Sequence, residues 1–99
     1  MKIYIAGKIT NYPDHKKHFL EAEQALTSLG HKVINPSVLP EGFEQQEYMH
    51  ICYSMIDVCD GVYMLDNWRD SVGAGKEHEY AKVNKKAVIY QLSEDVGEA

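Results

Sequence analysis

The sequence predicts a single α/β domain over residues 1–92, folded as a three-layer sandwich around a four- to five-stranded parallel sheet. Short runs rich in β-branched residues alternate with longer stretches whose apolar residues recur at helical spacing. Such alternation is typical of parallel sheets with helices on both faces, and 99 residues leave room for one core only. Because crossovers between parallel strands are right-handed, the topology reduces to a flavodoxin-like or Rossmann-like sandwich.

The first half of the chain is expected to supply two strands and one helix. Lys2–Ala6 is a short β-rich run and predicts the first strand. A helix then opens near Pro13 and stops before Gly30, since proline is tolerated in a first turn and glycine is common after a last one. Residues 31–35 predict a second strand, and the proline-containing residues 36–46 predict a loop.

The second half continues the alternation. Residues 47–58 predict a helix, residues 60–65 a strand, residues 73–85 a helix and residues 86–91 the last strand. The final segment, 93–99, is acidic and is expected to fray.

Composition limits the partners that the domain can have. A net charge of −5 without a basic stripe disfavours binding to a nucleic acid polymer. The sequence contains no apolar run of the roughly 20 residues that a membrane span needs, so no membrane partner is expected. Cys52 and Cys59 lie seven apart on the predicted second helix, hence about 10 Å apart and too far for a disulfide. Reduced, buried thiols indicate a cytoplasmic protein.

A metal site is not expected. His15 and His18 stand three apart on the first helix, a spacing that can hold a metal ion, but no Cys or His cluster accompanies them. We therefore interpret them as surface residues. The glycine-rich turn follows the third strand rather than the first, which excludes a dinucleotide fingerprint, and no cofactor is expected.

Two loops should meet at the carboxyl edge of the sheet, where ligands of such folds bind. They are residues 7–12 after the first strand and residues 66–75 after the third. In the second loop, Ser71 could cap the following helix or donate its hydroxyl to a phosphate. Gly73 and Gly75 could adopt backbone conformations that other residues avoid and let a ligand come close. The alternative is that these residues only make a tight connection.

Glu77 is the candidate reactive group. It shares a helix side with the small apolar Ala81, which is expected to pack on the sheet, so Glu77 should point inward at the strand ends. The alternative is a carboxylate that faces water and favours the helix dipole. Tyr4 is expected to belong to the core.

The motif Ser71-x-Gly73-x-Gly75-x-Glu77-x-x-x-Ala81 is similar to the signature of the nucleoside 2-deoxyribosyltransferase-like superfamily. It resembles the branch of 2′-deoxynucleoside 5′-monophosphate N-glycosidases and small relatives of unknown function. Residues 3–9 and 59–63 resemble the family's first strand and the strand before its motif.

This resemblance implies cleavage or transfer of an N-glycosidic bond, with Glu77 as the nucleophile that forms a glycosyl-enzyme intermediate. It implies a phosphate or 5′-end site made by Ser71, Gly73 and Gly75, because the family's monophosphate hydrolases carry Ser at the first motif position and its transferases carry Asp. The family's base and sugar contacts fall on three residues of the first loop: Gly7, Lys8 and Ile9. Asn67 and Trp68 of the second loop are further candidate substrate contacts. For Lys8, contact with a phosphate or the base and a solvated loop position both stay open. For Trp68, stacking on a base and packing in a subunit interface both stay open. A homodimer or larger assembly is implied, because family members complete their pocket with a neighbouring subunit.

One departure from the family concerns the base proton. The family usually has an Asp eight residues before Asp60, where this chain has Cys52, and a thiol cannot replace a carboxyl that handles this proton at neutral pH. Helical spacing places His50 and Asp57 on other sides of the helix. The alternative function is therefore a nucleotide-binding module without turnover, such as a sensor or a sequestering protein of phage or host defence. A third reading is a structural domain without a ligand.

Overall fold

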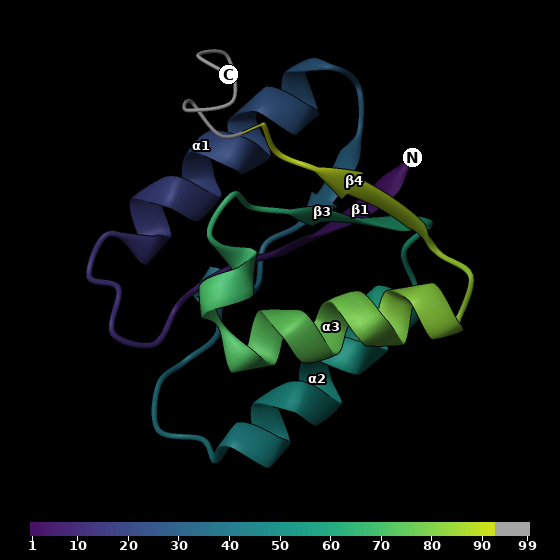
Figure 1. The fold of residues 1–99 in the computed structure, drawn as a ribbon. Coiled ribbons are helices and arrows are strands. Elements are labelled where there is room, and N and C mark those ends of the chain that lie inside the picture. The colour runs from purple at the N-terminus through teal and green to yellow at the C-terminus, as the bar shows by residue number, and fades with distance from the viewer. Residues whose placement is uncertain (93–99) are drawn as a thin grey trace.

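The structure, a computed structural model, describes residues 1–92 and contains a four-stranded sheet in which all strands are parallel (Figure 1). The predicted frayed segment, 93–99, lies outside the described residues. The strands are β1 (Lys2–Ala6), β2 (Lys32–Ile34), β3 (Gly61–Met64) and β4 (Ala87–Tyr90). The helices are α1 (His15–Ser28), α2 (Gln45–Asp57) and α3 (Val72–Val83), with two 3-10 turns, η1 (Pro36–Val38) and η2 (Trp68–Asp70). The predicted α/β class and parallel sheet are confirmed.

The three helices divide between the two faces of the sheet, with α1 on one face and α2 and α3 on the other (Figure 1). Alternate residues of β1 supply the two cores, because successive side chains of a strand point to opposite faces. Ile3 and Ile5 pack against α1, whereas Tyr4 and Ala6 pack beneath α2 and α3. All four are completely buried, which is why β1 reads as a continuous apolar run.

Local capping fixes where two of the helices begin. The Glu44 N–H donates to Glu47 Oε1 at 2.7 Å and completes a capping box, so α2 starts at Gln45, two residues before the predicted position. Ser71 caps α3, which therefore starts at Val72. The segments predicted as loops also contain the 3-10 turns η1 and η2. The sequence did not predict these turns.

The order β2-β1-β3-β4 places the switch point of the sheet between β1 and β3. From this central pair the chain crosses to β2 on one side and to β4 on the other. The segments that follow β1 and β3 therefore leave the sheet side by side. Their adjacency is visible in the backbone, since the Leu65 N–H donates to Ala6 O at 2.8 Å.

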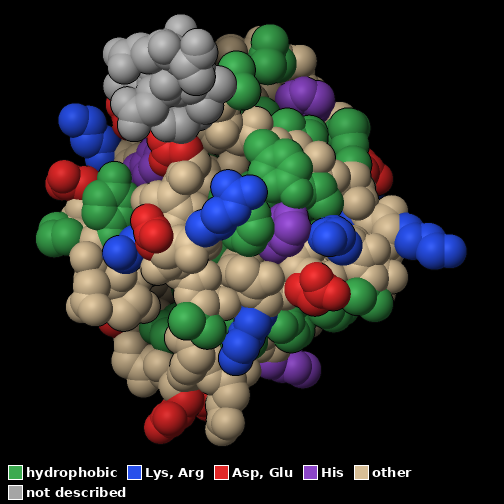
Figure 2. All heavy atoms as spheres, viewed as in Figure 1, with side chains coloured by type: hydrophobic (Ala, Val, Ile, Leu, Met, Phe, Trp, Pro, Cys, Tyr) green, Lys and Arg blue, Asp and Glu red, His purple; other side chains and the backbone are tan. Residues whose placement is uncertain are grey.

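The surface has mixed charge on the face shown in Figure 2, where acidic and basic side chains are interspersed over α3 and β4. Within residues 1–92, no helix is long and apolar enough to cross a membrane. Cys52 and Cys59 are buried and unpaired, as predicted.

Candidate functional site

A cavity of about 540 Å³ opens at the carboxyl edge of the sheet, among the segments that follow β1, β2 and β3. Its walls come from the segment after β1 with the start of α1, from η1 and α2, and from the start of α3. The volume lies within the range of small-molecule sites. The cavity thus occupies the switch point at which the sequence predicts a ligand site.

Glu77 lines this cavity from the second turn of α3. Its side chain is only 7% exposed, and its Oε2 accepts a hydrogen bond of 2.7 Å from the Tyr4 hydroxyl of β1. Ala74 and Ala81 occupy the same buried side of α3. The prediction that Glu77 points inward is confirmed. Tyr4 is buried in the core as predicted, and it also holds the carboxylate in place.

The environment of Glu77 shifts three titratable groups. Burial raises the pKa of the Glu77 carboxyl to about 7, although hydrogen bonds from Tyr4 and Cys52 act in the opposite direction. Burial, reinforced by the charge of Glu77, raises the pKa of the Cys52 thiol to about 12. The pKa of Tyr4 is likewise raised, first by burial and then by Glu77. At neutral pH, Tyr4 and Cys52 are therefore protonated, whereas Glu77 can exchange a proton.

Ser71 and Gly73 line the cavity at the start of α3, and Gly75 does not. The Ser71 Oγ accepts the Ala74 N–H at 3.1 Å, which leaves its hydroxyl proton for another acceptor. Neither glycine has a positive φ, since both lie inside α3, so the predicted special backbone conformations are wrong. A Cβ at Gly73 would lie 3.2 Å from Gln45 Nε2, whereas a Cβ at Gly75 would meet nothing within 4 Å. A side chain at Gly73 would therefore crowd the flexible end of Gln45, whereas one at Gly75 would crowd nothing.

The first loop supplies Gly7, Lys8 and Ile9 to the cavity. Gly7 is buried, and a Cβ there would lie 2.6 Å from Leu65 Cδ1 and 2.9 Å from Leu65 Cβ. Glycine is thus needed because the chain passes over the buried Leu65 as it leaves the sheet. The structure brings these three residues together with Ser71 and Glu77, as the sequence predicts.

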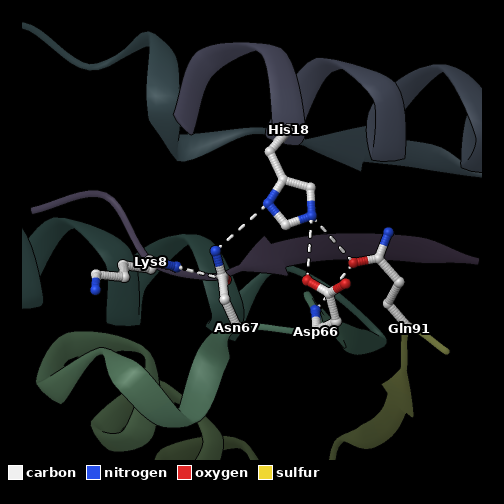
Figure 3. A network of polar contacts seen from close by, with 5 residues as sticks. All are labelled: Lys8, His18, Asp66, Asn67 and Gln91. Atoms are coloured by element: carbon white, nitrogen blue, oxygen red, sulfur yellow. Dashed lines mark hydrogen bonds and ion pairs between the residues drawn. The ribbon is translucent and has the colours of Figure 1, made fainter. Parts of the chain in front are cut away.

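Asn67 does not line the cavity but belongs to a polar network at the same edge of the sheet (Figure 3). Its Oδ1 accepts the Lys8 N–H at 3.1 Å, and its Nδ2 lies 3.5 Å from His18 Nδ1. On the other side of that ring, Nε2 lies 3.2 Å from Gln91 Oε1 and 3.4 Å from Asp66 Oδ1. Because both of these are acceptors, we assign the proton to Nε2 and an acceptor role to Nδ1. Asn67 therefore fixes the backbone of Lys8.

Trp68 also lies outside the cavity lining. Its ring stacks on His78 at 4.2 Å between centroids, and the Arg69 guanidinium lies 4.8 Å from its centroid. The turn η2 carries the side chain towards α3 and β4, where Tyr90 accompanies His78. This position does not allow Trp68 to stack on a ligand inside the cavity.

The sequence matches, over residues 1–90, the family described as Domain of unknown function (DUF4406). The chain belongs to this family. The match covers every strand and helix and both loops that line the cavity. No curated protein matches the sequence.

The cavity of this DUF4406 domain contains ionisable residues that the sequence did not identify as cavity residues. They are His15, Lys16, Glu41 and Asp70. His15 and His18 were expected on the surface but are both half-buried, and within residues 1–92 no group of three or more His, Cys, Asp or Glu could hold a metal ion. The position of His15 and Lys16 at the start of the helix after the first loop is a signal that could have identified them.

The DUF4406 cavity holds one buried carboxylate within a mostly apolar surround, and such a group can act as a nucleophile or exchange a proton. His50 and Asp57 of α2 are exposed and lie outside the cavity lining, as helical spacing predicts. Cys52 does line the cavity, beside Glu77. The arrangement therefore offers one buried carboxylate, with a thiol rather than a second carboxyl beside it.

Proposed function

We propose that this domain cleaves or transfers the N-glycosidic bond of a deoxynucleotide or deoxynucleoside, with Glu77 as the nucleophile. The observation that carries the proposal is the buried Glu77 carboxylate, held at the cavity by the Tyr4 hydroxyl at 2.7 Å. The resemblance of the Ser71-to-Ala81 motif to nucleoside 2-deoxyribosyltransferases supports the same chemistry. The position of the cavity at the switch point supports a small-molecule ligand.

The reaction consists of two displacements at the anomeric carbon of the sugar. A Glu77 oxygen attacks C1′, the C1′–N bond breaks, and its electron pair leaves with the base. Water or a second base then attacks C1′, releases the Glu77 carboxylate and gives up its proton to the group that protonated the leaving base. The hydrogen bond from Tyr4 stabilises the carboxylate form, which is the nucleophilic one.

The leaving base must also receive a proton. Cys52 is a poor donor, because burial raises its pKa to about 12. Other side chains with ionisable groups also line the cavity, among them His15, Glu41 and Asp70. None of them occupies the helical position beside Glu77 that Cys52 fills.

A second candidate function is nucleotide binding without turnover, and Cys52 is the observation that favours it. The Cys52 thiol lines the cavity next to Glu77, but its raised pKa keeps it from donating a proton near neutral pH. A sensor or a sequestering protein needs the cavity and no leaving-group acid.

Base release distinguishes the two functions. The four common 2′-deoxynucleosides and their 5′-monophosphates are incubated with the protein, and free base is followed by chromatography. We expect release by the wild type, a loss of more than about 1,000-fold in Glu77→Gln, and no loss in Glu79→Gln, whose exposed carboxylate lies on the same helix. Release that survives in Glu77→Gln contradicts the nucleophile role. Thermal stabilisation by the monophosphates without any release supports the binding module.

A further inference from the structure

The charges that line the cavity are divided between its walls. The wall formed by residues 4–19 carries two lysines, Lys8 and Lys16, and no carboxylate. The walls formed by residues 36–77 carry three carboxylates and no lysine or arginine: Glu41, Asp70 and Glu77. A ligand in the cavity therefore meets positive charge on one side only.

The α3 side places two carboxylates, Asp70 and Glu77, beside any dianion in the cavity. Asp70 lines the cavity directly before the helix, and its negative charge repels a phosphate placed there. The Ser71 Oγ already accepts the Ala74 N–H, so the cap satisfies one of the donors that the helix start would offer to an anion. Glu77 of α3 adds a second carboxylate to this side of the cavity.

We call the opposite wall the lysine wall and define it as Lys8 and Lys16. It offers unpaired positive charge to an anion. Neither ammonium group has a hydrogen-bond or ion-pair partner among residues 1–92, and no acidic residue occupies the first turn of α1. Asp14, the residue before α1, is exposed and does not line the cavity.

The backbone of the lysine wall is held in place before a ligand arrives. Asn67 accepts the Lys8 N–H, and the His18 network anchors Asn67 to the sheet edge (Figure 3). The Lys8 side chain extends away from that network (Figure 3) and lines the cavity. Tyr12 O accepts the His15 Nδ1–H at 3.0 Å, so the loop is also tied to the start of α1. Such prior ordering reduces the entropic cost of binding.

We propose that the lysine wall holds the phosphate of a deoxynucleoside monophosphate, so that the phosphate lies on the β1–α1 side of the cavity and not at the start of α3. The inference rests on the proposed function, because it takes the ligand to be a deoxynucleotide. It makes Lys8 and Lys16 the residues that select a 5′-monophosphate over the free nucleoside.

The test compares affinities for deoxynucleosides and their 5′-monophosphates, measured by calorimetry in wild type, Lys8→Gln, Lys16→Gln and Ser71→Ala. Lys17→Gln is the matched control, because Lys17 is an exposed lysine of α1 that does not line the cavity. We expect the wild type to prefer the monophosphate, and each lining-lysine variant to lose roughly 10-fold of that preference while nucleoside affinity stays unchanged. Lys17→Gln and Ser71→Ala should keep the preference.

Three results overturn the inference: equal wild-type affinity for nucleoside and monophosphate, a preference that survives in the double variant Lys8→Gln/Lys16→Gln, or a preference lost in Ser71→Ala alone. Circular dichroism confirms that each variant is folded. Failure of the proposed function is recognised separately, since base release by the wild type and its loss in Glu77→Gln do not depend on where the phosphate lies. Absence of binding by every nucleoside and monophosphate contradicts both.

Discussion

Burial and hydrogen bonding act in opposite directions on the Glu77 carboxyl. Burial favours the neutral acid, whereas the donors Tyr4 and Cys52 favour the carboxylate, and burial prevails. The resulting pKa of about 7 lies above the ordinary 4.5. A carboxyl with this pKa is partly ionised at neutral pH, so its effect on the free energy of unfolding depends on pH.

We predict that Glu77→Gln changes the pH dependence of stability. Between pH 4.5 and about 7 the folded protein keeps a proton that the unfolded chain has released, so the free energy of unfolding falls as pH rises. This contribution is complete below pH 4.5 and lost above pH 7, and it amounts to about 3 kcal/mol. In urea unfolding, the free energy of unfolding of Glu77→Gln relative to that of the wild type should therefore rise by about 3 kcal/mol between pH 4 and pH 8. Parallel pH profiles for the two proteins contradict the prediction.

We predict that Tyr4→Phe raises the pKa of Glu77 further, because it removes a donor that stabilises the carboxylate. The loss of this buried hydrogen bond should also cost about 1–3 kcal/mol of stability at pH 8, where Glu77 is ionised. An NMR titration of the Glu77 side-chain carboxyl carbon measures the pKa directly. Tyr63→Phe is the control, since Tyr63 packs on the α1 side of the sheet. An unchanged or lower pKa in Tyr4→Phe would show that Tyr4 does not act on Glu77.

At the scale of secondary-structure elements, the two glycines of α3 differ although their sequence contexts look alike. Gly73 faces Gln45 and Met49 of α2, whereas Gly75 faces open space. Glycine inside a helix costs about 0.5–1 kcal/mol relative to alanine. Only Gly73 has a neighbour that an added methyl group would crowd, and that neighbour is the end of the flexible Gln45 side chain.

We predict that Gly75→Ala raises the melting temperature by about 3–6 °C, because it removes that cost without a new contact. Gly73→Ala should gain less, since its methyl group would lie 3.2 Å from Gln45 Nε2. Calorimetric scans of both variants test the difference. A larger gain for Gly73→Ala than for Gly75→Ala contradicts it.

Most elements were predictable because their apolar periodicity is strong. The run Lys2–Ala6 and the inward register of Glu77 follow from side-chain spacing alone. The side-chain orientations of Asn67 and Trp68 could not be predicted, because they depend on the 3-10 turn η2. A turn of three residues is too short to produce a periodic pattern in the sequence. Lys16 lines the cavity because α1 packs on the sheet. This tertiary contact cannot be inferred from the spacing of residues along one helix.

At the scale of the whole molecule, the strand order decides where the site lies. The central strands β1 and β3 separate the two directions of winding, so the loops after them frame one cavity. The sheet thereby brings Tyr4 and Glu77 together across 73 positions of sequence. The cytoplasmic location stays a prediction.

We predict a homodimer or larger assembly, because apolar side chains stand exposed near the cavity mouth. Val72 and Val38 are both 77% exposed. Light scattering coupled to size exclusion should show a mass above that of one chain, and Val72→Asp should lower it, whereas Val83→Asp at the far end of α3 should not. A monomer at every concentration contradicts the prediction.

The most direct test of the central claim is to trap the bond between Glu77 and the sugar. A deoxynucleotide analogue with fluorine at C2′ slows the second displacement, because the fluorine destabilises the positively charged transition state. Mass spectrometry of the treated protein should show one added sugar phosphate on the peptide that carries Glu77, and none in Glu77→Gln. Release of base from natural deoxynucleotides without any adduct on that peptide would contradict the account.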